Sequence, residues 1–353
     1  MPNGDDHGIG EHNGILVTDL FMNWLITGGC GFIGRAITAH LLKHSTDHVR
    51  VLDNLSVGTR KELSQIGEVF DLDADHHADD WSMRLSLLEG DILNAQSVMA
   101  AVTGADIVIH LAANTGVGPS VEDPMSDCRT NVLGTLNLLE SARASHVGRF
   151  VFASSGAPLG AQTPPLHEEM APHPASPYGA SKLAGEGYCS AYFHCFGLET
   201  VVLRFGNVYG EGSGHKQSVV AKFIKQALAG EDLEIFGDGS QTRDFIHISD
   251  LVAAIAKAGR VSGVGGETFQ IATATETTVS EMTDTLTAVM AQGGVAPPTV
   301  FHGETRDGDV QRNYSDTSKA EDRLGWRSEV GLADGLRRTL QHFLPTHKNS
   351  KQR

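Results

Sequence analysis

Tyr178 and Lys182 are the two side chains whose types and spacing most directly suggest chemistry. They stand four residues apart in the stretch SPYGASKLAGEG, and on a helix this spacing places both on one face, about one turn apart. An ammonium beside a phenol, together with any further positive charge bound nearby, should lower the pKa of the phenol from about 10. The tyrosine could then act as a base near neutral pH. The alternative is a helix start, with Ser176 as cap, Pro177 at the first position and two solvated side chains.

A second stretch, SSGAPLG, raises a related question. Ser154 and Ser155 follow the apolar run 150–153, and the glycine, alanine and proline that come next are not acids. The serines are either part of a catalytic site or simply the end of a strand that enters a turn.

A glycine-rich stretch near the N-terminus indicates the cofactor. WLITGGCGFIGRAITAHLL reads as a buried strand followed by a helix with apolar residues at helical spacing. Gly29, Gly31 and Gly34 match the dinucleotide fingerprint, and Gly28, Gly31 and Gly34 match its longer-spaced relative. Such glycines allow a tight turn and close approach of the pyrophosphate, which the N-terminus of the helix attracts. A strand–helix turn that binds no ligand is the alternative.

The following strand ends complete this prediction. Asp53 ends the next strand 19 residues after Gly34, and an acid there binds the ribose 2′-hydroxyl and repels a 2′-phosphate, so NAD is predicted rather than NADP. Asp91 could accept a hydrogen bond from adenine, or form a turn before a helix. Ala112 and Ala113 are small enough for a cofactor to lie on the backbone. Alternating strands and helices around this motif predict a doubly wound parallel sheet.

Composition narrows the classes of function. The 353 residues carry a net charge of −16, which argues against binding to nucleic acid or to an anionic membrane. The four cysteines form no CxxC pair, which predicts neither a zinc site nor disulfides and favours the cytoplasm. No apolar run approaches the ~20 residues of a membrane helix. The histidines of the acidic stretch 71–81 are expected to lie in a solvated loop, and no metal site is predicted.

The segments TGGCGFIG, LDNLSVG, GDI, HLAA, NVLGT and SPYGASK occur in an order and approximate spacing that resemble the extended short-chain dehydrogenase/reductases. The chain is most similar to the nucleotide-sugar epimerases of the UDP-glucose 4-epimerase type, from about residue 22 to about residue 345. The resemblance implies an α/β fold, with a doubly wound parallel Rossmann sheet that binds NAD and a smaller C-terminal lobe that binds a UDP-sugar.

The resemblance also implies which residues hold NAD. They gather at the glycine turn, at the following strand ends and at the tyrosine–lysine pair: Gly28, Gly31, Phe32, Ile33, Gly34, Asp53, Asn54, Ser56, Gly58, Asp91, Ile92, Leu111, Ala112, Ala113, Asn131, Tyr178 and Lys182.

The resemblance makes Ser155 the third catalytic residue, which hydrogen-bonds the reacting hydroxyl of the sugar. The valine and tyrosine that usually precede the last glycine of this segment are here Pro158 and Leu159. Family dehydratases carry an Asp-Glu pair after this hydroxyl, and related decarboxylases a glutamate, whereas this chain has Gly156 and Ala157. Elimination is therefore disfavoured, and oxidation and reduction at one carbon remain.

The implied substrate contacts are Thr115, Ser155, Asn207, Lys216, Val219, Arg243, Arg306 and Asp309. Arg243 would bind the diphosphate through bidentate, charge-assisted bonds, unless it forms a surface ion pair with Asp244. Arg306 and Asp309 would grip the phosphate and the nucleoside, or pair with each other to fix a loop. Asn207 could equally be a turn residue. Lys216 could read a carboxylate or hydroxyls at C6 of the sugar, or could be solvated.

We expect residues 22–205 and 240–262 to form the NAD-binding domain, and residues 206–239 and 263–345 to form the lobe. Residues 1–21 are expected to be an extension, and 346–353 a tail. Apolar faces on the helices after Asn131 and Tyr178 suggest a homodimer, although each could be covered within the monomer. The leading hypothesis is a UDP-sugar 4-epimerase that acts through a 4-keto sugar. A reductase or synthase of the same fold, and a non-catalytic NAD-binding sensor, are the alternatives.

Overall fold

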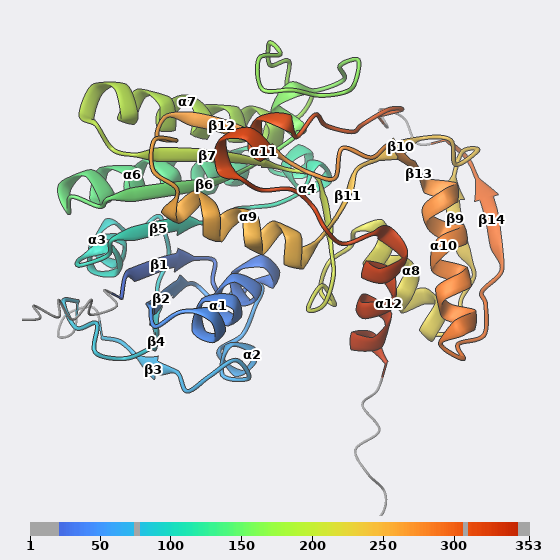
Figure 1. Cartoon of the computed structure of the whole chain (residues 1–353), viewed down its shortest axis with the longest axis horizontal. Coiled ribbons are helices and arrows are strands. Elements are labelled where there is room, and N and C mark those ends of the chain that lie inside the picture. The colour runs from blue at the N-terminus through green and yellow to red at the C-terminus, as the bar shows by residue number, and fades with distance from the viewer. Residues whose placement is uncertain (1–20, 74–77, 306–309, 345–353) are drawn as a thin grey trace, which may run out of the picture.

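The computed structural model describes residues 21–73, 78–305 and 310–344 (Figure 1). In this part of the chain, one large sheet contains eight strands, and every neighbouring pair is parallel. In spatial order the strands are β12 (Glu267–Ile271), β7 (Thr200–Phe205), β6 (Arg149–Ser155), β5 (Ile107–His110), β1 (Asn23–Thr27), β2 (His48–Asp53), β4 (Leu85–Glu89) and β3 (Phe70–Asp71). The α/β, doubly wound Rossmann fold predicted from the sequence is confirmed.

The central strands are apolar on both faces because helices cover both sides of the sheet. In β1, Trp24 and Ile26 pack into one core, while Leu25 between them packs into a second core on the opposite face. Strand β6 repeats this alternation, with Val151 in the first core and Phe150 in the second. The period of two along each strand therefore divides the interior into two layers.

Two sets of helices form these layers. The first core is closed by α1 (Phe32–His44), α9 (Ile248–Arg260) and α11 (Ser318–Leu324). The second is closed by α3 (Ala95–Val102), α6 (Gly134–Ala144) and α7 (Pro177–Phe196). Shorter helical segments lie at the edges: α2 (Arg60–Leu63), α4 (Val117–Glu122), α5 (Pro124–Cys128), a π-helical turn (Arg129–Leu133) and a 3-10 turn (Ala157–Leu159).

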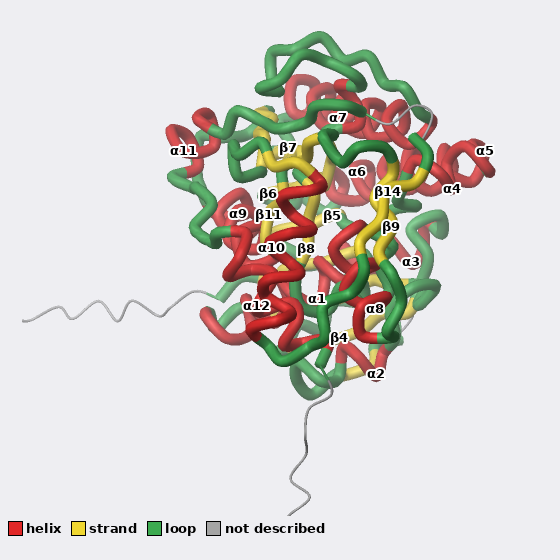
Figure 2. The backbone as a smooth tube through the Cα atoms, turned by 90° about the vertical axis from the view of Figure 1, so that its right-hand side faces the viewer, coloured by secondary structure: helices red, strands yellow, loops and turns green. Residues whose placement is uncertain are grey.

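A third apolar core forms the C-terminal lobe, which faces the viewer in Figure 2. The lobe contains α8 (Val219–Leu228), α10 (Val279–Gln292) and α12 (Leu332–Phe343). Short strand pairs complete and connect it: β9 (Leu233–Phe236) with β14 (Val300–Gly303), β10 (Thr242–Arg243) with β13 (Thr277–Thr278), and β8 (Asn207–Tyr209) with β11 (Phe245–His247). Tyr209 of β8 and Phe245 of β11 belong to this third core, so this pair joins the lobe to the large sheet.

The chain crosses between the two parts several times. Helix α9 lies within residues 240–262 and packs on β5, β6 and β7 of the large sheet. Strand β12 differs from the expectation. It lies within the range 263–345 assigned to the lobe, but it pairs with β7 as the edge strand of the large sheet. Its run TFQI offers buried apolar side chains to the first core, and this burial decides its place.

Candidate active site

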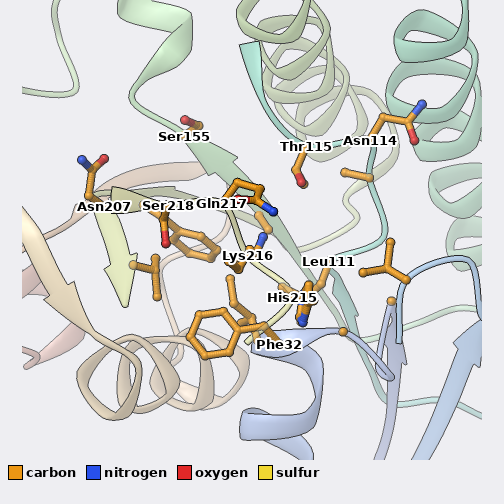
Figure 3. A pocket seen from close by; sticks show the side chains of 18 of the residues that line it. Phe32, Leu111, Asn114, Thr115, Ser155, Asn207, His215, Lys216, Gln217 and Ser218 are labelled. Carbon is orange, nitrogen blue, oxygen red and sulfur yellow. The ribbon is translucent and has the colours of Figure 1, made fainter. Parts of the chain in front are cut away.

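A cavity of about 690 Å³ lies at the carboxyl ends of the parallel strands, where they meet the lobe (Figure 3). Strand β1 has β2 on one side and β5 on the other, so the order of the strands reverses here. Such a reversal is where open α/β sheets bind their ligands. Of the predicted site residues in the described ranges, all line this cavity except Asn131. Arg306 and Asp309 lie outside the described residues.

The glycine turn between β1 and α1 has the shape that a dinucleotide requires. Gly28 has a φ of +68°, and a Cβ there would stand 2.8 Å from the backbone nitrogen of Ala112. A Cβ at Gly34 would stand 2.4 Å from the Gly28 carbonyl oxygen, so only glycine lets the helix approach the strand. No side chain caps α1 at Gly31, which leaves its first N–H groups to an anion. The turn therefore fits the pyrophosphate of NAD.

Asp53, at the end of β2, braces this turn as well as lining the cavity. One carboxylate oxygen accepts from the Cys30 backbone N–H at 2.9 Å, and the other accepts from Leu55 at 2.8 Å. Burial raises the pKa of Asp53, while these two backbone bonds act in the opposite direction. The predicted ribose acceptor is thus held rigidly at the edge of the cofactor space.

Asp91 forms a turn and also lines the cavity. It forms a turn by accepting from the Leu93 N–H at 2.8 Å, and its other oxygen accepts from the Asn54 side chain at 3.0 Å. Both residues also line the cavity. The loops after β2 and β4 are therefore tied together beside the predicted adenosine position.

Asn131 is not in direct contact with the cavity. It is buried in the π-helical turn, where its side chain accepts from the Asn114 N–H and donates to the Asn114 carbonyl, to Asp127 and to Ser181. The predicted contact with the cofactor is therefore corrected to an indirect one. Asn131 holds the loop that carries Thr115, because its side-chain amide forms hydrogen bonds with the backbone N–H and carbonyl of Asn114.

Ser155, Tyr178 and Lys182 come together from β6 and α7. Ser176 caps α7 by accepting from the Gly179 N–H, with Pro177 at the first position, as the sequence predicts. The side chain of Lys182 is nevertheless not solvated. It is only 4% exposed and donates to the Ala153 carbonyl oxygen at 2.9 Å. Ser155 stands at the strand end, where its hydroxyl accepts from the Ala157 N–H.

Desolvation dominates the electrostatics of Tyr178 and Lys182. Burial raises the pKa of Tyr178 to about 12, although its hydrogen bond with Ser155 acts in the opposite direction. Burial lowers the pKa of Lys182 to about 8. The lowered tyrosine pKa was expected from the ammonium together with a positively charged cofactor ring. In the chain by itself, desolvation of the phenol has the largest effect on this pKa.

In the lobe, Asn207, Val219 and Arg243 line the cavity. Arg243 donates to the backbone carbonyls of Thr242 and Val310, so its guanidinium is held in place by the loop after β14. Asp244 forms no surface ion pair with it. Instead, Asp244 is buried and accepts from Thr273 and Ser315.

Lys216 lies on the loop between β8 and α8, among the side chains shown around the cavity in Figure 3. Burial lowers the pKa of its ammonium. Within the described ranges, that ammonium makes no hydrogen bond or ion pair with the protein. A half-buried lysine in this state is available to a ligand.

His215, the other basic residue of the loop that carries Lys216, also lines the cavity. Several other lining residues were not foreseen, among them Gln217 beside Lys216, and Glu234 and Gln241 in the lobe. No motif marks these positions, because their approach to the cavity depends on how the lobe folds over the sheet. Within the described part of the chain, no cluster of His, Cys, Asp or Glu could hold a metal ion. No helix described there is long and apolar enough to cross a membrane.

Comparisons with known proteins agree with this geometry. The model of the NAD dependent epimerase/dehydratase family matches residues 24–272, which run from β1 to the residue after β12. The UDP-glucose 4-epimerase of Mycolicibacterium smegmatis is 36% identical over 327 residues, which cover 91% of this chain and 98% of that protein.

Two solved structures are also similar. That of UDP-glucose 4-epimerase from Thermotoga maritima with UDP-glucose has a TM-score of 0.80 and 33% identity, covering 91% of this chain and 98% of that one. That of UDP-glucuronic acid 4-epimerase from Bacillus cereus, in complex with UDP-glucuronic acid and NAD, has a TM-score of 0.79 and 28% identity, with the same coverage. The match thus spans both the sheet and the lobe.

Proposed function

Because this chain belongs to the NAD dependent epimerase/dehydratase family, we propose that it inverts C4 of a UDP-sugar through a 4-keto intermediate. One observation carries this proposal. Ser155, Tyr178 and Lys182 line the same cavity as the glycine turn, while Gly156 and Ala157 place no carboxyl group beside them. The UDP-glucose and UDP-glucuronic acid 4-epimerases among its relatives support the same reaction.

Each catalytic side chain has a distinct task. When held at the glycine turn, NAD would supply the hydride acceptor and donor for C4 of the sugar. The Tyr178 oxygen takes the proton of the C4 hydroxyl, and the Ser155 hydroxyl orients that oxygen by a hydrogen bond. The Lys182 ammonium favours the phenolate by its charge. The keto sugar then turns about its diphosphate, and Tyr178 returns the proton to the oxygen when the opposite face is reduced.

The positions of the acidic side chains that line the cavity favour epimerisation over dehydration. In the described ranges they are Asp53, Asp91 and Glu234. The first two follow β2 and β4 beside the proposed NAD site, and the third lies on β9 in the lobe. None follows Ser155, where an acid would be needed to protonate a departing hydroxyl, so elimination at C5 and C6 lacks its proton donor.

The proposal is tested by incubating the purified protein with a panel of nucleotide sugars and following the products by NMR, without added cofactor. In D₂O, a 4-epimerase of this kind incorporates no solvent deuterium at any ring carbon. Deuterium at C5 or C6 would identify a dehydratase instead. Turnover that requires added NADH or NADPH would identify a reductase, and NAD binding without turnover of any sugar would identify a sensor.

Within this function, we propose that Lys216 recognises the substituent at C6 of the sugar. Its half-buried ammonium can bind a carboxylate, and a hydrogen bond to a charged group is worth about 1.5–3 kcal/mol, or roughly 10- to 150-fold. Lys216→Met should therefore lower kcat/KM for UDP-glucuronate relative to UDP-glucose.

Lys222 provides the matched control for Lys216. It also lines the cavity, but its ammonium lies 5.6 Å from the centroid of the Phe236 ring in the lobe. Lys222→Met should change kcat/KM for both substrates by a similar factor. If the ratio between the substrates does not move in Lys216→Met, this lysine does not read C6.

We also propose that the protein is a homodimer. Val117 and Val121 on α4, Met125 on α5, and Tyr188 and Phe196 on α7 are exposed apolar side chains. Helices α4 and α5 both pack on α7. A second copy would bury them. The four unpaired cysteines support a reducing compartment, and we place the protein in the cytoplasm.

A further inference from the structure

Lys182 is a buried cation that needs a compensating charge. Its ammonium donates to one carbonyl oxygen, that of Ala153 at 2.9 Å, and lies 4.9 Å from the centroid of the Phe152 ring. Isolated charges are costly to bury and tend to lose their charge unless they are paired. A neutral amine at this position would no longer favour a phenolate at Tyr178.

Glu186, one helical turn beyond Lys182 on α7, is already neutralised. Its two carboxylate oxygens accept from the Arg204 guanidinium at 2.9 and 2.7 Å, and one also accepts from the Ser154 hydroxyl at 2.6 Å. Both members of the pair are buried, at 7% and 6% exposure. Glu186 is therefore paired with Arg204, and its charge raises the pKa of Lys182 less than that of Asp127 does.

Asp127 on α5 is the remaining acid, and it is only 2% exposed. One of its oxygens accepts from Asn131 at 2.9 Å, while the other has no hydrogen-bond partner within the described residues. Asn131 also donates to Ser181, the neighbour of Lys182, and α5 packs on α7. We propose that the Asp127 carboxylate is the counter-charge that keeps Lys182 protonated beside Tyr178, which makes it a positioning residue for the proposed reaction.

The other titratable groups around Lys182 do not supply an unpaired negative charge. On α7, β5 and β7, these groups are Tyr178, Glu186, Cys189, His110 and Arg204. Burial raises the pKa of Tyr178 and of the Cys189 thiol, so both are neutral near pH 7. Burial lowers the pKa of His110 to about 3, so it is neutral as well.

Asp127 affects the lysine and the tyrosine in a way that can be measured. Its charge raises the pKa of Lys182 against the effect of burial, and it also raises the pKa of Tyr178. Removing the charge should therefore lower both values. Both limbs of a pH profile should then move to lower pH, a pattern that the loss of a purely structural contact would not produce.

The test is an NMR titration of protein labelled with ¹³C at lysine Cε, with Lys182→Met used to assign the signal. In Asp127→Asn, which keeps an oxygen for Asn131, the pKa of Lys182 should fall from about 8 by about one pH unit or more. Asp127→Glu keeps the charge and should restore most of the wild-type value. Asp123→Asn is the matched control, because Asp123 caps the same helix by accepting from Ser126 and should leave the titration unchanged.

Equal Lys182 titrations in Asp127→Asn and Asp123→Asn would overturn the proposal. If the variants do not fold, the wild-type protein still tests the proposal. The ¹³C chemical shift of the Asp127 carboxyl group must then change as Lys182 loses its proton. The absence of that response would also overturn it. The expected shift in the pH profile of kcat rests on the proposed function, whereas the NMR titration of Lys182 does not. A lowered lysine pKa without turnover of any UDP-sugar would refute the proposed function and leave the counter-charge intact.

Discussion

Tyr178 shows how burial and catalysis oppose each other at a single residue. Its phenol is half-buried at the start of α7, and desolvation raises its pKa to about 12. The hydrogen bond with Ser155 of β6 acts against this effect, and a positive charge on Lys182, one helical turn further along, favours the phenolate. A proton acceptor near neutral pH therefore requires the whole group, with the positive charge of bound NAD added to it.

Replacement of Tyr178 by phenylalanine should keep the fold and remove the acid–base group. We expect kcat to fall by about 10²–10⁴ with little change in the affinity for the nucleotide sugar, measured by coupled assay and by calorimetry. Tyr188→Phe is the matched control, because Tyr188 lies on the same helix but is exposed and does not line the cavity. A near-normal rate in Tyr178→Phe would remove this residue from the proposed role.

We expect Asp53 to set the preference for NAD by its charge. Asp53→Asn keeps an oxygen for the backbone of the glycine turn but no longer repels a 2′-phosphate. The ratio of the Kd for NADP to the Kd for NAD should fall by roughly 10-fold or more, since a charged hydrogen bond is worth about 1.5–3 kcal/mol.

Calorimetric titrations with both cofactors measure this ratio. Asp91→Asn is the comparison, because Asp91 lines the cavity next to Asn54 rather than the glycine turn. This change should weaken both cofactors to a similar extent. An unchanged ratio in Asp53→Asn would show that another group discriminates against NADP.

At the scale of elements, helix α7 is fastened to the sheet by a buried ion pair. Glu186 on α7 binds Arg204 on β7 and Ser154 on β6, so three elements that carry the active site share one carboxylate. Its position one turn after Lys182 keeps the catalytic face of the helix directed at the carboxyl end of β6. The pair therefore links the stability of the fold to the geometry of the site.

Removing one partner of a buried pair leaves an uncompensated charge. Glu186→Gln should lower the free energy of unfolding by about 3–5 kcal/mol, measured by urea denaturation followed by circular dichroism. Asp334→Asn provides the control, since Asp334 pairs with Arg337 on the exposed side of α12 and should change stability little. Similar effects of the two substitutions would show that the buried pair does not fasten α7.

At the scale of the whole molecule, the apolar side chains of α4, α5 and α7 predict the proposed homodimer. Val121 and Met125 are 61% and 62% exposed, and a second copy would remove them from water. The double substitution Val121→Asp and Met125→Asp should shift sedimentation equilibrium from dimer to monomer. Met83→Asp is the control on the loop before β4, where Met83 is also exposed. A wild-type protein that is monomeric at micromolar concentration would contradict this prediction.

The sequence by itself determined the Rossmann sheet and nearly half of the residues that line its cavity. This was possible because the relevant signals are local. The glycine turn needs residues without a Cβ within a few positions, Asp53 follows directly from the end of a strand, and Tyr178 and Lys182 are related by one turn of a single helix. Backbone geometry alone then places them at one edge of a parallel sheet.

Only the tertiary structure decided features that depend on contacts distant in the chain. Asn131 was expected at the cofactor but lies behind the loop that it holds, since its partners come from three separate segments. Strand β12 joined the large sheet rather than the lobe because its apolar side chains are buried there. The raised pKa of Tyr178 follows from burial. The pairing of Glu186 with Arg204, which leaves Asp127 as the proposed partner of Lys182, follows from the packing of the helices on the sheet and of α5 on α7. Desolvation and charge pairing are set by the folded environment, which residue spacing does not encode.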